Sequence, residues 1–373
     1  MKSRTRRETL PICGVLLAGG RGTRFWPRSR LRTPKQLLNI AGGDTMLRET
    51  AARLHPLIAP RNLWVVTNAQ QVAAVRDQLR AVPATNVLAE PVGRNTAAAI
   101  GLTAIHLVHA HGDALMAVLP SDSHVSDAAK YRTLMRAALD LVRDPGKLAV
   151  FGIPPTQPDT GYGYIELGSA AVKARSVQVC TVRRFTEKPA LPLARKYVAS
   201  GKYLWNAGMF FWRASTFLEN LRRFLPATHA ALQNLAPTIG TRRYAAALRR
   251  TYPQLENISV DYGIMESATR VSGPPRVFVV PAKVGWSDIG SWAAVYDFLA
   301  SKPGANVSAG ALFALDAEGN YFWSPKKLIA AIGTNNLIVV ETDAALLICD
   351  RSRAQDVGKI VKWLEQQKKT NLL

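Results

Sequence analysis

The sequence has few cysteines, and none are paired at a metal-binding spacing. Three cysteines occur among 373 residues, and Cys13, Cys180 and Cys349 each lie in an apolar stretch. A disulfide framework needs more cysteines, and a zinc site needs them closely spaced, as in Cys-x-x-Cys. The sequence therefore indicates neither, and we expect reduced, buried thiols, as in a cytoplasmic protein.

Long apolar runs are also missing. No stretch reaches the roughly 18 uninterrupted apolar residues of a membrane-spanning helix. The opening MKSRTRRETLPICGVLLAGG has a basic start, paired arginines and a short apolar run, as an export peptide does. No small-residue cleavage site follows, and cleavage near Gly20 would remove residues that the fold needs as its first strand. We therefore expect a cytoplasmic protein without a membrane partner.

Acidic residues are scarce relative to basic ones. The chain has 48 Lys and Arg against 26 Asp and Glu, a formal net charge of +22. This surplus suits a polyanion such as a nucleic acid, a nucleoside triphosphate or a sugar phosphate, but a general compositional bias explains it equally well. A nucleic-acid-binding protein would show a clustered basic face. It would leave Asp122, Glu187 and Asp288 without a role, so we expect no nucleic-acid partner.

Two common glycine motifs for phosphates are absent from the start of the chain. There is no P-loop ending in Gly-Lys-Ser/Thr and no G-x-G-x-x-G, which excludes an ordinary nicotinamide dehydrogenase. Instead, GVLLAGGRGTRFWPRSRLRTPKQLL joins an apolar run to glycines and many basic residues. Glycines let backbone N–H groups approach a phosphate chain, while arginines and Lys35 balance its charge. A structural turn with exposed arginines is the alternative.

Short apolar strands alternate with amphipathic helices up to about residue 153, which predicts a doubly wound α/β sheet. The first strand is expected from Ile12 to Ala18. Beyond Lys302 the pattern changes to short alternating segments and a charged terminal helix from about Ser352. This change predicts a small β-rich appendage with a helical tail.

Helix boundaries are indicated by capping residues. Asp44 or Thr45 is expected to cap the helix after the arginine-rich loop, and Asn95 or Thr96 the helix that contains AAAIGLTAIHLVHA. The histidines that close this helix suit its C-terminal dipole, with a metal site as the less favoured alternative. These histidines are His106, His109 and His111.

Two separated aspartates stand where predicted strands meet loops. AVLPSD places Asp122 at the carboxyl edge of the sheet, where doubly wound folds bind ligands, and Asp288 follows VPAKVGW. Either aspartate alone would be interpreted as a turn or cap residue. Together with a polyphosphate loop, they suggest Mg²⁺ held partly by protein and partly by phosphate oxygens.

These features together resemble the sugar nucleotidyltransferase family, and several of them its guanine and mannose branch. The resemblance covers the chain from about Pro11 to about Arg353. The strings that carry it, in family order, are LLAGGRGTRFWPRSR with PKQ, EPVGRNTAAAI, LPSDSH, TGYGYIE, RFTEKP, WNAGMF, SVDYGIME and WSDIGSW.

The resemblance implies a Rossmann-like mixed sheet, the nucleotidyltransferase fold, over residues 10–300. It implies a left-handed β-helix-like domain with a terminal helix over residues 305–373, which would make a homodimer contact. The implied reaction joins GTP and mannose 1-phosphate into GDP-mannose with release of diphosphate. An enzyme of the same family that uses another sugar 1-phosphate or another nucleotide is the alternative.

Site residues follow from the matching motifs. The catalytic residues that the resemblance implies are Arg24, Lys35, Asp122, Lys188 and Asp288. The implied nucleotide-binding residues are Leu17, Ala18, Gly19, Gly20, Gly22, Thr23, Arg24, Pro91, Asn95, Thr96 and Asp122. The implied sugar-phosphate-binding residues are Gly161, Glu187, Lys188 and Asn206. The implied Mg²⁺ ligands are Asp122 and Asp288.

Some of these assignments have structural alternatives. Asn95 and Thr96 could cap a helix rather than contact the base. Without the surrounding motif, Glu187 and Lys188 would be an ordinary surface ion pair. The aromatic residues beside Asn206 are expected in the core.

The chain departs from the family pattern in a few places. The family has its histidine directly after the metal-binding aspartate, whereas here Ser123 separates His124 from Asp122, so no role is assigned to His124. Phe25 stands where leucine is commoner. Because the sequence ends near the close of the β-rich appendage, we expect no isomerase activity toward mannose phosphates.

Overall fold

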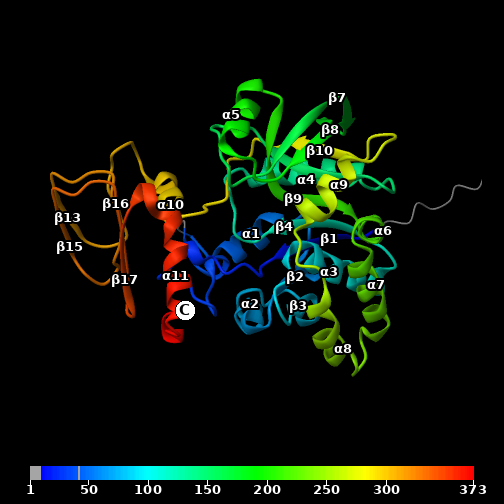
Figure 1. The fold of residues 1–373 in the computed structure, drawn as a ribbon, viewed down its shortest axis with the longest axis horizontal. Coiled ribbons are helices and arrows are strands. Elements are labelled where there is room, and N and C mark those ends of the chain that lie inside the picture. Colours follow the sequence, from blue (N-terminus) through cyan, green and yellow to red (C-terminus); the bar gives the residue numbers. More distant parts are fainter. Residues whose placement is uncertain (1–9, 41–42) are drawn as a thin grey trace, which may run out of the picture.

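The computed structural model describes residues 10–40 and 43–373, so the basic start of the export-like stretch lies outside the described residues. Strands and helices alternate along the first half of the chain, as predicted (Figure 1). The strands are β1 (Ile12–Leu17), β2 (Leu63–Asn68), β3 (Val87–Glu90), β4 (Leu115–Pro120), β5 (His124–Val125), β6 (Leu148–Ile153), β7 (Tyr164–Ala174), β8 (Val177–Thr186), β9 (Tyr203–Arg213), β10 (Val277–Pro281) and β11 (Trp286–Ser287). The helices are α1 (Met46–Leu54), α2 (Val72–Gln78), α3 (Asn95–His111), α4 (Ala128–Leu141), α5 (Leu191–Ser200), α6 (Ala214–Phe224), α7 (Pro226–Leu235), α8 (Tyr244–Thr251), α9 (Glu266–Thr269), α10 (Trp292–Leu299) and α11 (Val357–Gln366).

The main sheet is mixed and has nine strands in the order β3-β2-β1-β4-β9-β6-β10-β8-β7. Strand β1 pairs in parallel with β2 and β4, whereas β9 runs antiparallel to β4 and β6. Separate apolar cores cover its two faces, one including residues of α3, α6 and α7 and the other including residues of α1 and α4. The parallel register pairs Leu17 with Pro120, so β1 and β4 end side by side. The mixed Rossmann-like sheet is thereby confirmed.

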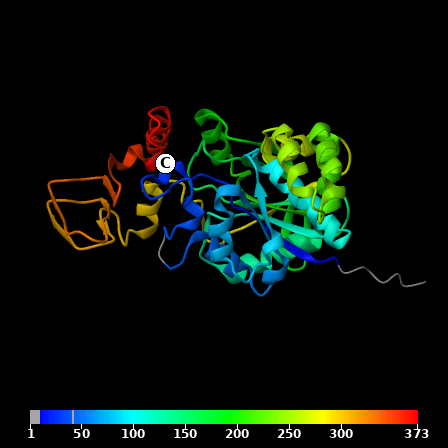
Figure 2. The same ribbon diagram turned by 90° about the horizontal axis from the view of Figure 1, so that it is seen from below.

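A β-rich appendage follows the main sheet and lies at one end of the molecule in both views (Figures 1 and 2). Its strands are β12 (Val307–Ser308), β13 (Leu312–Leu315), β14 (Tyr321–Trp323), β15 (Ile329–Ile332), β16 (Leu337–Thr342) and β17 (Ala345–Asp350). Strand β13 pairs in parallel with β15, and β14 pairs in parallel with β12 and β16. Helix α11 packs beside these strands and closes a third apolar core. The β-helix-like appendage with its helical tail is thereby confirmed.

Of the two predicted helix caps, the one at α1 is confirmed and the one at α3 is wrong. Thr45, one of two expected candidates, caps α1, because its side chain accepts from the N–H of Arg48 at 3.4 Å. The prediction that Asn95 or Thr96 caps α3 is wrong. Arg94 holds the cap position without a side-chain bond, and Asn95 opens the helix with a φ of 60°. Thr96 instead accepts through its hydroxyl from the N–H of Val260 at 2.8 Å.

The histidines at the end of α3 have a structural partner. The Nε2 atom of His106 lies 2.7 Å from the hydroxyl oxygen of Tyr244. Burial lowers the pKa of His106 to about 4, and His109 adds to this effect. Within residues 10–40 and 43–373, no cluster of three His, Cys, Asp or Glu is placed to hold a metal ion. Nor does any helix of these ranges have the length and apolarity needed to cross a membrane.

Candidate active site

A cavity of about 380 Å³ opens where β1 and β4 end. Doubly wound sheets bind ligands at this edge. Its lining includes several of the residues predicted to bind the nucleotide, namely Leu17, Gly19, Gly20, Asn95, Thr96 and Asp122. It also includes residues that the sequence did not single out, among them Gln36, Glu90, Gly208 and Asp261. The glycine loop and the acidic strand end thus share one cavity.

The glycine loop needs its glycines for close approach. Gly22 has a φ of 58°, and a Cβ there would lie 2.5 Å from the Cβ of Lys35. A Cβ at Gly19 would lie 2.8 Å from a carboxylate oxygen of Glu90, whereas one at Gly20 would meet nothing within 4 Å. The loop therefore packs against Lys35 on one side and is open at Gly20, where a ligand can reach the backbone.

Lys35 is the residue that joins the two predicted metal-binding aspartates. Its side chain is 4% exposed, and its ammonium donates to the backbone oxygens of Asp122 and Asp288, both at 2.6 Å. It also lies 3.1 Å from the Asp122 carboxylate. Gln36 donates to the carbonyl oxygens of Ala18 and Gly20 at 2.7 and 3.1 Å and so ties the loop to the same turn.

Asp288 is held in place by its neighbours. The hydroxyl of Tyr162 donates to its carboxylate at 2.8 Å, and burial together with this carboxylate raises the pKa of Tyr162 well above its usual value. Ile289 has a φ of 41°, which is strained for a β-branched residue. A Cβ at Gly290 would lie 2.5 Å from an Asp288 carboxylate oxygen, so only glycine fits beside that group.

The donor set fits a magnesium ion. Asp122 and Asp288 are partly exposed residues that one lysine holds together, and hard cations such as Mg²⁺ prefer oxygen ligands. Mg²⁺ commonly takes one or two carboxylates and completes its shell with water and substrate phosphates. Asp122 lines the cavity and Asp288 is linked to it through Lys35, which matches that pattern.

A second cluster lies just after β8 and on β9. The side chain of Glu187 is 9% exposed, and one oxygen lies 3.1 Å from the ammonium of Lys188. Its other oxygen is buried without a hydrogen-bond partner. Burial, followed by the nearby Asp261, raises the pKa of Glu187 against the opposing effect of Lys188. Asn206 donates to the Asp261 carboxylate at 2.7 Å, so Asp261 lies between Asn206 and the Glu187 carboxyl whose pKa it raises.

Gly163, rather than Gly161, packs against this cluster. A Cβ at Gly163 would lie 2.4 Å from a Glu187 oxygen, and the Gly163 carbonyl accepts from the N–H of Asn206 at 2.8 Å. Gly161 lies exposed in the preceding turn, where its N–H donates to Asp159 at 2.7 Å. The repeated glycine in TGYGYIE was the available signal, but the sequence did not distinguish its two positions.

The cavity lining also contains a buried acid. Glu90 is 6% exposed, and its carboxylate accepts from the Tyr252 hydroxyl at 2.7 Å. Burial raises the pKa of Glu90. Pro91, the next residue, does not line this cavity and instead faces a separate groove of about 850 Å³ that includes His106.

The last part of the glycine loop faces the C-terminal helix. Arg24 donates to the side-chain oxygen of Gln355 at 2.8 Å, and Arg21 pairs with Glu365 at 2.6 Å. A Cβ at Gly358 would be 3.5 Å from the Thr23 hydroxyl, so the loop and α11 are in contact. Gly22, Thr23 and Arg24 do not line the cavity itself.

His124 lies on β5, opposite Ser287 of β11. Its ring packs against Phe298 at a centroid distance of 4.5 Å, and burial lowers its pKa. These contacts are structural and assign no catalytic role to His124.

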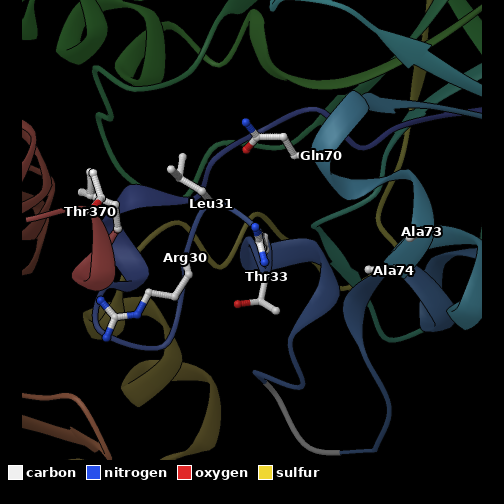
Figure 3. A pocket seen from close by; sticks show the side chains of 9 residues that line it. Arg30, Leu31, Thr33, Gln70, Ala73, Ala74 and Thr370 are labelled. Atoms are coloured by element: carbon white, nitrogen blue, oxygen red, sulfur yellow. The ribbon is translucent and has the colours of Figure 1, made fainter.

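A larger cavity of about 920 Å³ lies elsewhere (Figure 3). Arg30 and Thr370 extend from one side of it, and Gln70, Ala73 and Ala74 lie on the other. Among the described residues that line it, none is acidic and none is a predicted site residue, so it lacks the groups that the proposed chemistry needs.

The geometry agrees with comparisons to known proteins. The family model described as Nucleotidyl transferase matches residues 13–302, and a model described as MannoseP isomerase/GMP-like beta-helix domain matches residues 310–364. The chain belongs to the nucleotidyl transferase family.

Within that family the chain is similar to mannose-1-phosphate guanylyltransferases. One from Salmonella muenchen is 40% identical over 356 residues, which cover 94% of this chain and 73% of the relative. One from Escherichia coli K12 is 37% identical over 359 residues, 94% of this chain and 73% of the relative. A solved structure from Thermus thermophilus, described as a mannose-1-phosphate geranyltransferase, is 33% identical with a TM-score of 0.84, and the match covers 95% of this chain and all of that one.

Proposed function

We propose that the protein is a mannose-1-phosphate guanylyltransferase that converts GTP and α-D-mannose 1-phosphate into GDP-mannose and diphosphate. One observation carries the proposal: the Lys35 ammonium joins Asp122, at the cavity beside the glycine loop, to Asp288. A fixed cation that links Asp122, at the cavity, to a second aspartate suits phosphoryl transfer, which depends on positioning and charge balance. The similarity to mannose-1-phosphate guanylyltransferases supports this choice of substrates.

The proposed chemistry is a single displacement. An oxygen of the sugar phosphate attacks the α-phosphorus of GTP and forms a P–O bond. The bond from that phosphorus to the oxygen shared with the β-phosphate breaks, and diphosphate leaves with the electron pair. No covalent enzyme intermediate is needed, because the chain's task is to align two anions and balance their charge. We assign Lys35 and Arg24 to the phosphates of GTP and Lys188 to the sugar phosphate.

We assign Mg²⁺ to Asp122 and Asp288. Held there, the ion would supply Lewis-acid polarisation of the phosphoryl oxygens. The chain's own residues prepare the site: Tyr162 orients the Asp288 carboxylate, and Lys35 fixes the backbone of both aspartates. The glycine loop, Asn95 and Thr96 would hold the triphosphate and the base, while Pro91 remains a prediction.

We propose that residues 10–300 form the catalytic domain and residues 305–373 the dimerising domain, and that the enzyme works in the cytoplasm. Its three cysteines are unpaired, which suits a reducing compartment.

Large apolar side chains on β13, β15 and β17 are exposed, including Phe313 (54%) and Ile332 (63%). Exposed apolar patches of this kind mark interaction surfaces, and a second copy of the chain is the occupant that we propose.

Replacing Phe313 and Leu315 together by aspartate is expected to convert the dimer into monomers. Both residues lie on β13 and are about half exposed, so the change places charge on the proposed interface without disturbing a core. Size-exclusion chromatography with light scattering measures the mass. Leu193→Asp, at an exposed apolar residue of α5 outside the proposed dimerising domain, is the control and should remain dimeric. A double variant that still elutes as a dimer would place the interface elsewhere.

Replacing Glu187 by glutamine is expected to raise the KM for mannose 1-phosphate about tenfold, because the buried, unpartnered oxygen is placed to accept from a sugar hydroxyl. The pKa of Glu187 is raised. As the pH falls through this pKa, Glu187 gains a proton, and the KM of the native enzyme for mannose 1-phosphate is expected to rise. This rise should begin at a higher pH than for an ordinary carboxyl. Steady-state kinetics across pH measure both effects, and an unchanged pH profile in Glu187→Gln would remove Glu187 from the sugar site.

The first experiment is diphosphate release by the purified protein with Mg²⁺, GTP and mannose 1-phosphate, beside a matrix of other nucleotides and sugar phosphates. Activity that requires both substrates and stops with chelator is the expected result. Activity with another pair would keep the reaction class and change the substrate. No release across the matrix would overturn the proposal.

A further inference from the structure

The glycine loop, which is the phosphate loop of the proposed function, starts at the main sheet and ends in the third apolar core, the C-terminal core. Phe25 and Trp26, at the end of the glycine loop, are 1% and 7% exposed. They belong to the third apolar core, together with Ile289 and Tyr321. Two of the loop's glycines, Gly19 and Gly20, line the nucleotide cavity, so one short segment connects that cavity to the β-rich appendage.

Trp292 is the residue that joins the parts of this core. It is fully buried at the start of α10, and its indole N–H donates to the carbonyl oxygen of Trp26 at 3.1 Å. Its ring meets Phe25 edge-on at a centroid distance of 5.1 Å and stacks on Tyr321 of β14 at 5.5 Å. One side chain thus contacts both the phosphate loop and the appendage.

The segment that leads to Trp292 carries Asp288. The carbonyl of Asp288 accepts from Lys35, and the next residue, Ile289, is fully buried with its strained φ of 41°. A strained backbone persists only where the surrounding structure holds it. Here, Ile289 and Trp292 are both buried in the C-terminal core, and this packing keeps the strained backbone in place.

We infer that Trp292 is a positioning residue for the phosphate loop: its indole N–H and ring fix the backbone around Phe25 and Trp26, and with it the place of Arg24. The inference rests on the proposed function, in which this loop binds GTP. It makes the C-terminal core part of the catalytic apparatus. The side-chain partners of the sugar-side residues Glu187 and Asn206 are Lys188 and Asp261. Trp292 instead contacts Trp26, Phe25 and Tyr321, so the effect should be confined to GTP.

Trp292→Phe tests the inference, because it keeps an aromatic ring and removes only the donor and part of the packing. We expect kcat/KM for GTP to fall about tenfold, since small misplacement of a positioning loop costs one to two orders of magnitude. The KM for mannose 1-phosphate should change less than about twofold. The Kd for GTP, measured by calorimetry without sugar phosphate, should rise in parallel.

Trp212→Phe is the matched control. Trp212 is also fully buried and stacks on Phe210 and Phe217, but it lies in the core on one face of the main sheet. It should lower the unfolding temperature by a similar amount and leave the ratio of the two KM values unchanged. Tyr321→Leu removes the ring on the far side of Trp292 and covers the case in which Trp292→Phe does not fold. It should also weaken GTP binding.

The outcomes separate the two proposals. If the native protein is inactive, the proposed function fails, and calorimetry with GTP still tests the positioning role. If the native protein is active and both Trp292→Phe and Tyr321→Leu keep their affinity for GTP, Trp292 is only a core residue. Equal losses for GTP and mannose 1-phosphate would also overturn the inference, because they would indicate general damage.

Discussion

Replacing Lys35 by methionine is expected to lower kcat by about a thousandfold, the scale for removing a fixed charge donor at a phosphoryl centre. Lys35 is 4% exposed, and its ammonium meets three oxygens of Asp122 and Asp288. Methionine has a similar length but no donor, so these oxygens lose a buried partner and the proposed phosphate site loses its central charge. Diphosphate release at saturating substrates measures the loss.

Lys35→Arg should not restore activity. A planar guanidinium is larger than an ammonium and cannot meet the same three oxygens in the buried space around Lys35. Lys147→Met, which removes a partly exposed lysine paired with Asp144, is the control and should retain activity. Circular dichroism checks that each variant is folded. A folded Lys35→Met with native kcat would show that Lys35 serves the fold alone.

Some of the site could be predicted from sequence because its signals are local. The glycine loop follows directly from β1, and Asp122 follows directly from β4, so alternating strands and helices were enough to predict one edge for both. Asp288 was predicted from a shorter signal, a strand followed by a loop, together with the family resemblance. The structure brings it to Lys35 from far along the chain.

Other features depend on contacts that no local pattern contains. Tyr162 could not be linked to Asp288 from sequence, because the bond joins the segments beside β7 and β11, which meet only in the folded chain. The prediction that Thr96 could cap α3 was wrong for the same reason. Its hydroxyl has a tertiary partner, Val260, which outweighs the helix-capping preference of threonine.

The sequence also did not show that the opening motif packs into two different apolar cores, one at the main sheet and one at the appendage. The string GTRFWPR reads as one loop, and Phe25 was noted only as an apolar exchange for leucine. In the structure Phe25 and Trp26 pack with the appendage, which begins far later in the sequence. Burial depends on which surfaces meet, and periodicity within one segment does not contain that information.

Asp288→Asn is expected to abolish turnover, with a fall in kcat of about a thousandfold, while the fold is retained. Asparagine has the same shape, and its side-chain oxygen can still accept from the Tyr162 hydroxyl. The backbone carbonyl that binds Lys35 is unaffected by the change. What is lost is one negative charge, and a divalent cation binds a neutral amide oxygen more weakly than a carboxylate.

Because Asp288→Asn removes a charge, its loss of kcat should depend on how tightly the metal ion binds and not on the free energy of unfolding. Raising the Mg²⁺ concentration should recover part of the activity, and titration with Mn²⁺ followed by electron paramagnetic resonance should show weaker binding than in the native protein. Asp297→Asn is the control, since Asp297 is exposed on α10 and near the same segment. It should keep native kcat and metal affinity. An Asp288→Asn variant with full activity would remove Asp288 from the metal site and leave Asp122 as the single protein carboxylate for the ion, with its remaining ligands supplied by the triphosphate and water.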